Sequence, residues 1–131
     1  MPVPPHPLRI LVVDDDPLIL MNLVDMIEDM GHVVTPAATG QQALDELAEH
    51  AYDVVVTDHS MPGMSGLQLI KAVGAAYPSA AMVLATGYVD LPTDGMTNTF
   101  GRLLKPYSQA DLKEALDLAV KSRLPGLPPL A

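Results

Sequence analysis

Short apolar runs alternate with longer amphipathic stretches along most of the chain. The runs are rich in Val, Ile and Leu and are bounded by turn-forming residues, which is typical of β-strands buried on both faces. The longer stretches repeat apolar residues every three or four positions, as helices with one buried face do. We therefore expect strands over residues 9–13, 32–35, 52–57, 81–85 and 102–104. We expect helices over residues 17–30, 41–50, 66–76 and 109–123.

This alternation of strands and helices predicts an α/β fold. Continuous apolar strands need cover on both faces, so the expected architecture is a doubly wound three-layer sandwich around a five-stranded parallel sheet. The weakest element lies between the fourth and fifth strands, where residues 89–101 contain Pro92, Gly95 and Gly101. This segment supports at most a short or irregular fourth helix, around residues 93–100, and we expect it to be mobile.

Polar side chains gather where the predicted strands end. In a doubly wound sheet, ligands bind beyond the carboxyl ends of the strands, at the point where the strand order reverses. The residues at these positions are Asp14, Asp15, Asp16, Asp58, Thr86 and Lys105. We interpret Asp16, which precedes Pro17, as the N-cap of the first helix, and we expect Gly31 to end that helix.

The other carboxylates at this edge would repel one another, so they favour a hard divalent cation with oxygen ligands, Mg²⁺ first. A carboxylate in such a place can attack phosphorus as a nucleophile and form an aspartyl phosphate. The metal ion and the ammonium group of Lys105 would neutralise the transferring oxygens. The predicted reaction class is phosphoryl transfer.

Composition narrows the range of partners. The 131 residues include 16 Asp and Glu against 7 Lys and Arg, a net charge of −9, and no Cys. The acidic surplus would repel nucleic acid and anionic membranes, and the lack of Cys excludes disulfides and thiolate metal sites. No apolar stretch reaches the roughly 18 residues of a membrane span. Without Cys, redox chemistry does not indicate a compartment, and cytoplasm is the default location. We expect one domain over residues 8–124, between Pro-rich flexible tails at 1–7 and 125–131.

Four motifs lie in order at the ends of the predicted strands. They are LVVDDDP at 11–17, VTDHSMPGMSG at 56–66, LATGY at 84–88 and LKP at 104–106. With these motifs the sequence resembles the receiver domains of two-component response regulators, and is similar to free-standing chemotaxis receivers, over about residues 8–124. The resemblance implies a flavodoxin-like fold with strand order 2-1-3-4-5.

The resemblance also implies roles for the acidic residues. Asp58 would be the phosphoacceptor. Asp15, with Asp14 acting partly through water, would hold Mg²⁺ together with Asp58 and the backbone carbonyl of Ser60. In this family the phosphoryl group comes from a histidine kinase or a histidine phosphotransfer protein, which are therefore the expected partners.

Two further residues would sense the phosphoryl group. Thr86 would bond a phosphoryl oxygen through its hydroxyl, and Lys105 would pair with phosphate and with the acceptor carboxylate. In this family the peptide at Lys105–Pro106 is usually cis, and the resemblance implies the same here; an X-Pro bond allows it because it loses most of its trans preference. On phosphorylation we expect Thr86 to move toward Asp58 and to change the face formed by the fourth helix, the fifth strand and the last helix.

Three positions are candidates for tuning the response. Three residues before the lysine, where the family commonly has an aromatic switch residue, this chain has Arg102. Arg102 would instead pair with acidic groups of the surface or of a partner. Ser60 and Tyr88 occupy positions that in this family gate water access to the phosphate, and we expect a bulky Tyr88 to slow hydrolysis.

The first helix is more apolar than one buried face requires. Leu18, Ile19 and Met21 lie near the acidic edge of the sheet and are left over after the positions that can serve the sheet. One interpretation is packing on a neighbouring helix. The other is a helix-on-helix contact with the phosphodonor protein, to which Pro106 would also contribute.

Alternative functions remain at this stage. Asp14 and Asp16 could be the nucleophile pair of a haloacid-dehalogenase-like phosphohydrolase, although only the distant Asp90 follows the fourth strand. A degenerate receiver could act as an interaction module without phosphorylation, although none of the expected site residues is missing. The chain could also be a free-standing receiver or a piece of a longer protein such as a hybrid kinase.

Overall fold

Five strands and four helices follow one another in a computed structural model that describes residues 7–77, 79–87 and 101–122. The strands are β1 (Arg9–Val13), β2 (Val33–Ala37), β3 (Val54–Asp58), β4 (Ala81–Thr86) and β5 (Gly101–Leu104). The helices are α1 (Pro17–Asp29), α2 (Gly40–Glu49), α3 (Gly66–Ala76) and α4 (Gln109–Ser122). The predicted short helix around residues 93–100 lies outside the described residues.

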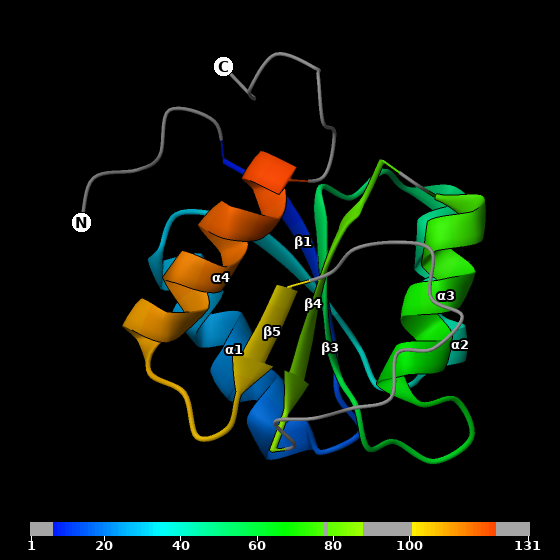
Figure 1. The fold of residues 1–131 in the computed structure, drawn as a ribbon, viewed down its shortest axis with the longest axis horizontal. Helices are drawn as coiled ribbons and strands as arrows, with labels where there is room; N and C mark the ends of the chain where they lie inside the picture. Colours follow the sequence, from blue (N-terminus) through cyan, green and yellow to red (C-terminus); the bar gives the residue numbers. More distant parts are fainter. Residues whose placement is uncertain (1–6, 78, 88–100, 123–131) are drawn as a thin grey trace.

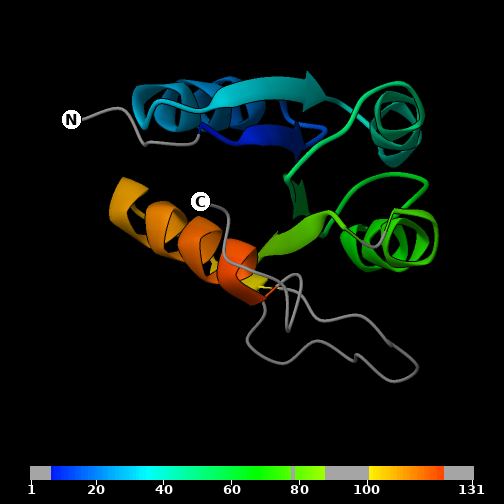
Figure 2. The same cartoon turned by 90° about the horizontal axis from the view of Figure 1, so that it is seen from above.

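The strands form one parallel sheet in the order β2-β1-β3-β4-β5. Helices α1 and α4 cover one face of the sheet and α2 and α3 cover the other, as Figures 1 and 2 show. The predicted doubly wound three-layer sandwich with strand order 2-1-3-4-5 is therefore confirmed. The order reverses between β1 and β3, and the carboxyl ends of these two strands define the edge where a ligand is expected.

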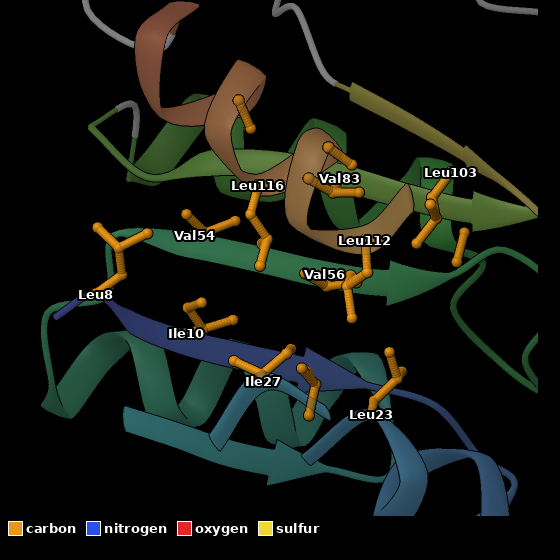
Figure 3. Packing of buried hydrophobic residues seen from close by; sticks show 14 of the residues in the cluster. Leu8, Ile10, Leu23, Ile27, Val54, Val56, Val83, Leu103, Leu112 and Leu116 are labelled. Atoms are coloured by element: carbon orange, nitrogen blue, oxygen red, sulfur yellow. The ribbon is translucent and has the colours of Figure 1, made fainter. Parts of the chain in front are cut away.

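Alternate side chains of the central strands fill two separate cores. Ile10 and Val12 of β1 belong to the core beneath α1 and α4, whereas Leu11 and Val13 belong to the core beneath α2 and α3. Figure 3 shows the first of these cores, in which Leu23 and Ile27 of α1 and Leu112 and Leu116 of α4 meet the sheet. Because both faces are buried, these strands are continuous apolar runs rather than alternating ones.

Capping residues set the ends of the helices. The Asp16 side chain accepts hydrogen bonds from the backbone N–H groups of Leu18 (2.9 Å) and Ile19 (3.4 Å), which confirms its predicted role as the N-cap of α1. After Met30, Gly31 adopts a positive φ of 94°, a conformation that favours glycine and ends the helix as predicted.

Four strands differ from the predicted bounds. Strand β4 runs one residue further, to Thr86, and β5 begins one residue earlier, at Gly101. Strand β2 covers Val33–Ala37 rather than residues 32–35. Its pairing with β1 begins at Val33, whose N–H donates to the Leu8 carbonyl (2.9 Å), and His32 lies before the strand. The Nδ1 atom of His32 accepts the Leu8 N–H (3.0 Å). Strand β3 begins at Val54 rather than at residue 52, and it extends to include the last residue, Asp58. Among the described helices, none is long and apolar enough to cross a bilayer.

Candidate functional site

Three carboxylates meet at the edge of the sheet where the strand order reverses. The register pairs Val13 of β1 with Thr57 of β3, so the next residues, Asp14 and Asp58, leave adjacent strands side by side. Carboxylate oxygens of Asp14, Asp15 and Asp58 all lie within 4.8 Å of one another. Asp14 and Asp58 are buried and Asp15 is exposed. One acidic group therefore faces solvent while the other two line the base of the cluster.

The backbone shapes this acidic cluster. The Oδ1 atom of Asp14 accepts a hydrogen bond from the Asp16 N–H (2.9 Å), which fixes the turn that leaves β1. Asp16 directs its own carboxylate to the first turn of α1 instead of to the cluster. Of the three consecutive aspartates, only Asp14 and Asp15 therefore join Asp58.

Lys105 supplies the compensating positive charge. Its Nζ donates to the Oδ1 atom of Asp58 at 2.5 Å, and its side chain is 32% exposed against 8% for the aspartate. The lysine reaches this position because β5 lies beside β4, and the Lys105 N–H donates to the Thr86 carbonyl (2.9 Å). The following Lys105–Pro106 peptide is cis, as predicted.

Thr86 is the last residue of β4 and is buried, with 2% of its surface exposed. The register places Ala85 opposite Asp58, so Thr86 follows directly beyond the acceptor strand. The chain thus brings together the carboxylates of β1 and β3, the threonine of β4 and the lysine of β5. These are the residues that the sequence predicted for this edge.

The charge balance of the cluster favours a divalent cation. Three carboxylates and one ammonium group leave an excess of negative charge in a partly buried place. Burial raises the pKa of Asp14, the Asp16 N–H lowers it, and the nearby Asp58 raises it again. Several closely spaced carboxylate oxygens that repel one another fit Mg²⁺, which binds through carboxylates and retains water ligands. The donor set therefore suits the predicted metal ion.

Two neighbours of the site were not predicted from the sequence. Tyr107 is half-buried, and burial, followed by the charges of Asp14 and Asp58, raises the pKa of its hydroxyl group. Gly66 is the first residue of α3, and a Cβ added there would lie 2.4 Å from the Asp58 carbonyl oxygen.

The loop from β3 to α3 carries Ser60, which is exposed two residues after Asp58. Gly63 in this loop has a positive φ of 80°, and the Gly66 N–H closes the loop onto the His59 carbonyl (2.9 Å). Ser65 begins α3 in a capping box with Gln68. Ser60 is thus held in a short, well-connected loop beside the carboxylates.

The candidate docking residues lie mostly at the surface. Leu18 is 76% exposed and Met21 is 63% exposed, whereas Ile19 is half-buried against the core of α1 and α4. Packing on a neighbouring helix within the described chain therefore does not account for Leu18 and Met21. Pro106 is also exposed.

The candidate tuning residues are only partly described. Arg102 is exposed on β5, where it lines a shallow cavity of about 370 Å³ with Leu104, Pro106 and acidic residues of α4. Tyr88 lies outside the described residues. Arg102 thus shares this cavity with Asp111 and Glu114 of α4, and its pairing with acidic groups stays a prediction.

Comparison with known proteins agrees with this geometry. The response regulator receiver domain family matches residues 10–117. The response regulator protein FleR of Pseudomonas aeruginosa is 32% identical over 123 residues, covering 92% of this chain and 25% of FleR. The virulence sensor protein BvgS of Bordetella pertussis is 46% identical over 69 residues, covering 53% of this chain and 6% of BvgS. The chain thus spans a quarter or less of these two relatives.

Solved structures lead to the same family. The response regulator TrrA of Thermotoga maritima, in complex with Mg²⁺ and BeF, is 30% identical with a TM-score of 0.77, covering 85% of this chain and 97% of that one. A CheY-like receiver domain protein of Methanospirillum hungatei is 26% identical with a TM-score of 0.81, covering 90% and 97%. The chain therefore belongs to the response regulator receiver domains of two-component signalling systems.

Proposed function

We propose that this domain accepts a phosphoryl group on Asp58 from a phosphohistidine of a histidine kinase or a histidine phosphotransfer protein. The observation that carries the proposal is the meeting of Asp14, Asp15 and Asp58 within 4.8 Å, with Lys105 on the acceptor carboxylate. A carboxylate oxygen of Asp58 forms the new bond to phosphorus as the bond from phosphorus to the histidine nitrogen breaks. The electron pair of that bond stays with the imidazole.

Each residue of the site has a distinct task in this transfer. Lys105 pairs with the acceptor carboxylate before transfer and with a phosphoryl oxygen after it. Asp14, Asp15, Asp58 and the Ser60 carbonyl would hold Mg²⁺. An ion held there would supply positive charge that neutralises the phosphoryl oxygens during transfer. The hydroxyl group of Thr86 donates to the phosphoryl oxygen once it is on Asp58.

Two surfaces connect the site to other proteins. The phosphodonor docks its helical bundle on Leu18, Ile19 and Met21, with Pro106 at the side, because two of these apolar side chains are largely exposed beside the acidic edge. The movement of Thr86 toward the phosphate changes the face that includes β5 and α4, where Arg102 lies. A downstream protein binds this face in one of its two states.

The decisive experiment is to incubate the protein with Mg²⁺ and a small acyl phosphate and to measure the mass of the intact chain. We expect a gain of one phosphoryl group that Asp58→Asn abolishes and that omission of Mg²⁺ prevents. Asp25→Asn is the matched control, because Asp25 is exposed on α1 away from the cluster. Turnover of a phosphate ester would instead support a hydrolase, and absence of any phosphoryl group would support a degenerate receiver.

A further inference from the structure

A methionine of the β3–α3 loop is seated against the first residue of α2. A Cβ added to Gly40 would lie 2.7 Å from the Sδ atom of Met64, 3.0 Å from its Cβ and 3.1 Å from its Cγ. A 2.7 Å contact is shorter than real Cβ atoms show, and contacts of 3.0 and 3.1 Å are tighter than most, so an added Cβ would make Met64 shift. Met64 thus occupies space that the glycine at position 40 leaves open. Gly40 is buried and Met64 is half-buried.

This contact joins the loop to a different element of the fold. Met64 also packs on the core beneath α2 and α3, as does Met61 of the same loop. Figures 1 and 2 show α2 and α3 on the same side of the sheet, with the β3–α3 loop beside them. The side chain of Met64 therefore ties the loop to α2, in addition to its covalent connection to α3.

The loop is short enough to transmit a shift of Met64 to its other residues. Its ends are held by the hydrogen bond from the Gly66 N–H to the His59 carbonyl (2.9 Å). Within it, the Met64 N–H donates to the Pro62 carbonyl (3.1 Å), and Gly63 makes the turn between them with its positive φ of 80°. Because the loop is short and hydrogen-bonded at both ends, a displacement of Met64 should also shift the residues that precede Gly63, including Ser60.

We propose that Met64, seated on Gly40, is a positioning residue that holds the β3–α3 loop, and with it the Ser60 carbonyl, in place for the metal ion beside Asp58. This inference rests on the proposed function, which assigns the Ser60 carbonyl to Mg²⁺. Outer groups that orient metal ligands typically change metal affinity by about 10- to 100-fold when they are lost. For one carbonyl on a loop, we expect the lower end, about tenfold.

A double-variant cycle tests the contact directly. The Mg²⁺ dissociation constant and the free energy of unfolding without metal are measured for wild type, Met64→Ala, Met64→Leu, Gly40→Ala and the double variant Gly40→Ala/Met64→Ala. Met64→Ala and Gly40→Ala should each weaken Mg²⁺ binding about tenfold. Met64→Leu, which keeps most of the side-chain volume, should remain near wild type. The double variant should bind Mg²⁺ no more weakly than Met64→Ala, because the added methyl group then has room.

The control for a glycine substitution is Gly101→Ala. A Cβ at Gly101 would meet its nearest neighbour, Val83 Cγ2, at an ordinary 3.6 Å, so Mg²⁺ affinity should not change. If Gly40→Ala does not fold, the comparison of Met64→Ala with Met64→Leu still tests the inference.

Two results would overturn the inference. In the first, Met64→Ala lowers the free energy of unfolding but leaves Mg²⁺ affinity unchanged, so that Met64 is only core filler. In the second, the losses of affinity in the two single variants add in the double variant, so that the residues act independently. Failure of the proposed function has a different signature, because wild-type protein would then bind no Mg²⁺ or take up no phosphoryl group on Asp58.

Discussion

Gly66 is the position where a single methyl group should do most harm to the acceptor site. A Cβ added there would lie 2.4 Å from the Asp58 carbonyl oxygen, 2.6 Å from Leu84 Cδ1 and 2.8 Å from His59 Cα. Two of these three atoms belong to the backbone at the end of β3, so they cannot turn away as a flexible side chain can. Gly66→Ala must therefore displace α3, the carboxyl end of β3, or both.

The expected loss of stability follows from two opposing contributions. An extra methyl group in a well-packed core costs about 1–3 kcal/mol, occasionally more, and backbone contacts under 3 Å place this site at the upper end. The higher helix propensity of alanine stabilises the folded state by at most about 1 kcal/mol relative to glycine. We expect a net loss of about 2 kcal/mol in the free energy of unfolding, which corresponds to roughly a 30-fold change in the ratio of folded to unfolded protein.

Urea denaturation measures this loss, and the initial rate of phosphorylation by a small acyl phosphate measures its effect on the site. Because the Asp58 backbone moves, the rate should fall together with the stability. Gly101→Ala, with its ordinary contacts, is the control and should leave both quantities near wild type. A Gly66→Ala protein within about 0.5 kcal/mol of wild type, the range of a neutral surface change, would refute this reasoning.

Three further predictions concern charge, pH and docking. Burial raises the pKa of Asp14, so its ionised form destabilises the metal-free domain at neutral pH. Asp14→Asn should therefore raise the free energy of unfolding at pH 7 while weakening Mg²⁺ binding. A lower free energy of unfolding for this variant in urea denaturation would contradict the reasoning. Burial lowers the pKa of His32, whose Nδ1 accepts the Leu8 N–H, below its ordinary 6.5. As the pH falls, the unfolded chain therefore protonates His32 before the folded chain does, and the free energy of unfolding should fall below about pH 6.5. His32→Gln should reduce this fall. An equal fall in the free energy of unfolding between pH 7.5 and 5.5 in the two proteins would count against the reasoning. Ile19→Glu and Met21→Glu should slow transfer from a phosphohistidine protein more than transfer from a small acyl phosphate, and equal effects on the two donors would remove the docking surface.

The sequence by itself determined the elements and the location of the site. Continuous apolar runs such as 9–13 and 81–85 predict strands covered on both faces, because burial acts on each residue locally and leaves a local pattern. Polar residues at the ends of those runs had to share one edge of a parallel sheet. For this reason Asp58, Thr86 and Lys105 could be singled out before any coordinates were known.

Boundaries that depend on partners from distant strands were less predictable. Strand β2 extends to Ala37 because each of its residues pairs with β1, from Arg9 opposite Val33 to Val13 opposite Ala37. Pro36 in the sequence indicates the end of a strand, but an edge strand tolerates proline on its outer side. The register between the two strands, and not the local sequence, sets where β2 ends.

Tertiary structure decided the side-chain contacts that no local pattern in the sequence records. The pairing of Lys105 with Asp58, which the family resemblance implied, spans 47 positions. The contact of Met64 with Gly40 joins the β3–α3 loop to α2 on the same side of the sheet. No period or spacing in the sequence records such a contact, because it depends on the order of the strands and on the packing of helices across them. The sequence thus placed the carboxylates, Thr86 and Lys105 at one edge of the sheet, and the parallel order β2-β1-β3-β4-β5 with the packing of the helices set the distances between them and the position of the β3–α3 loop.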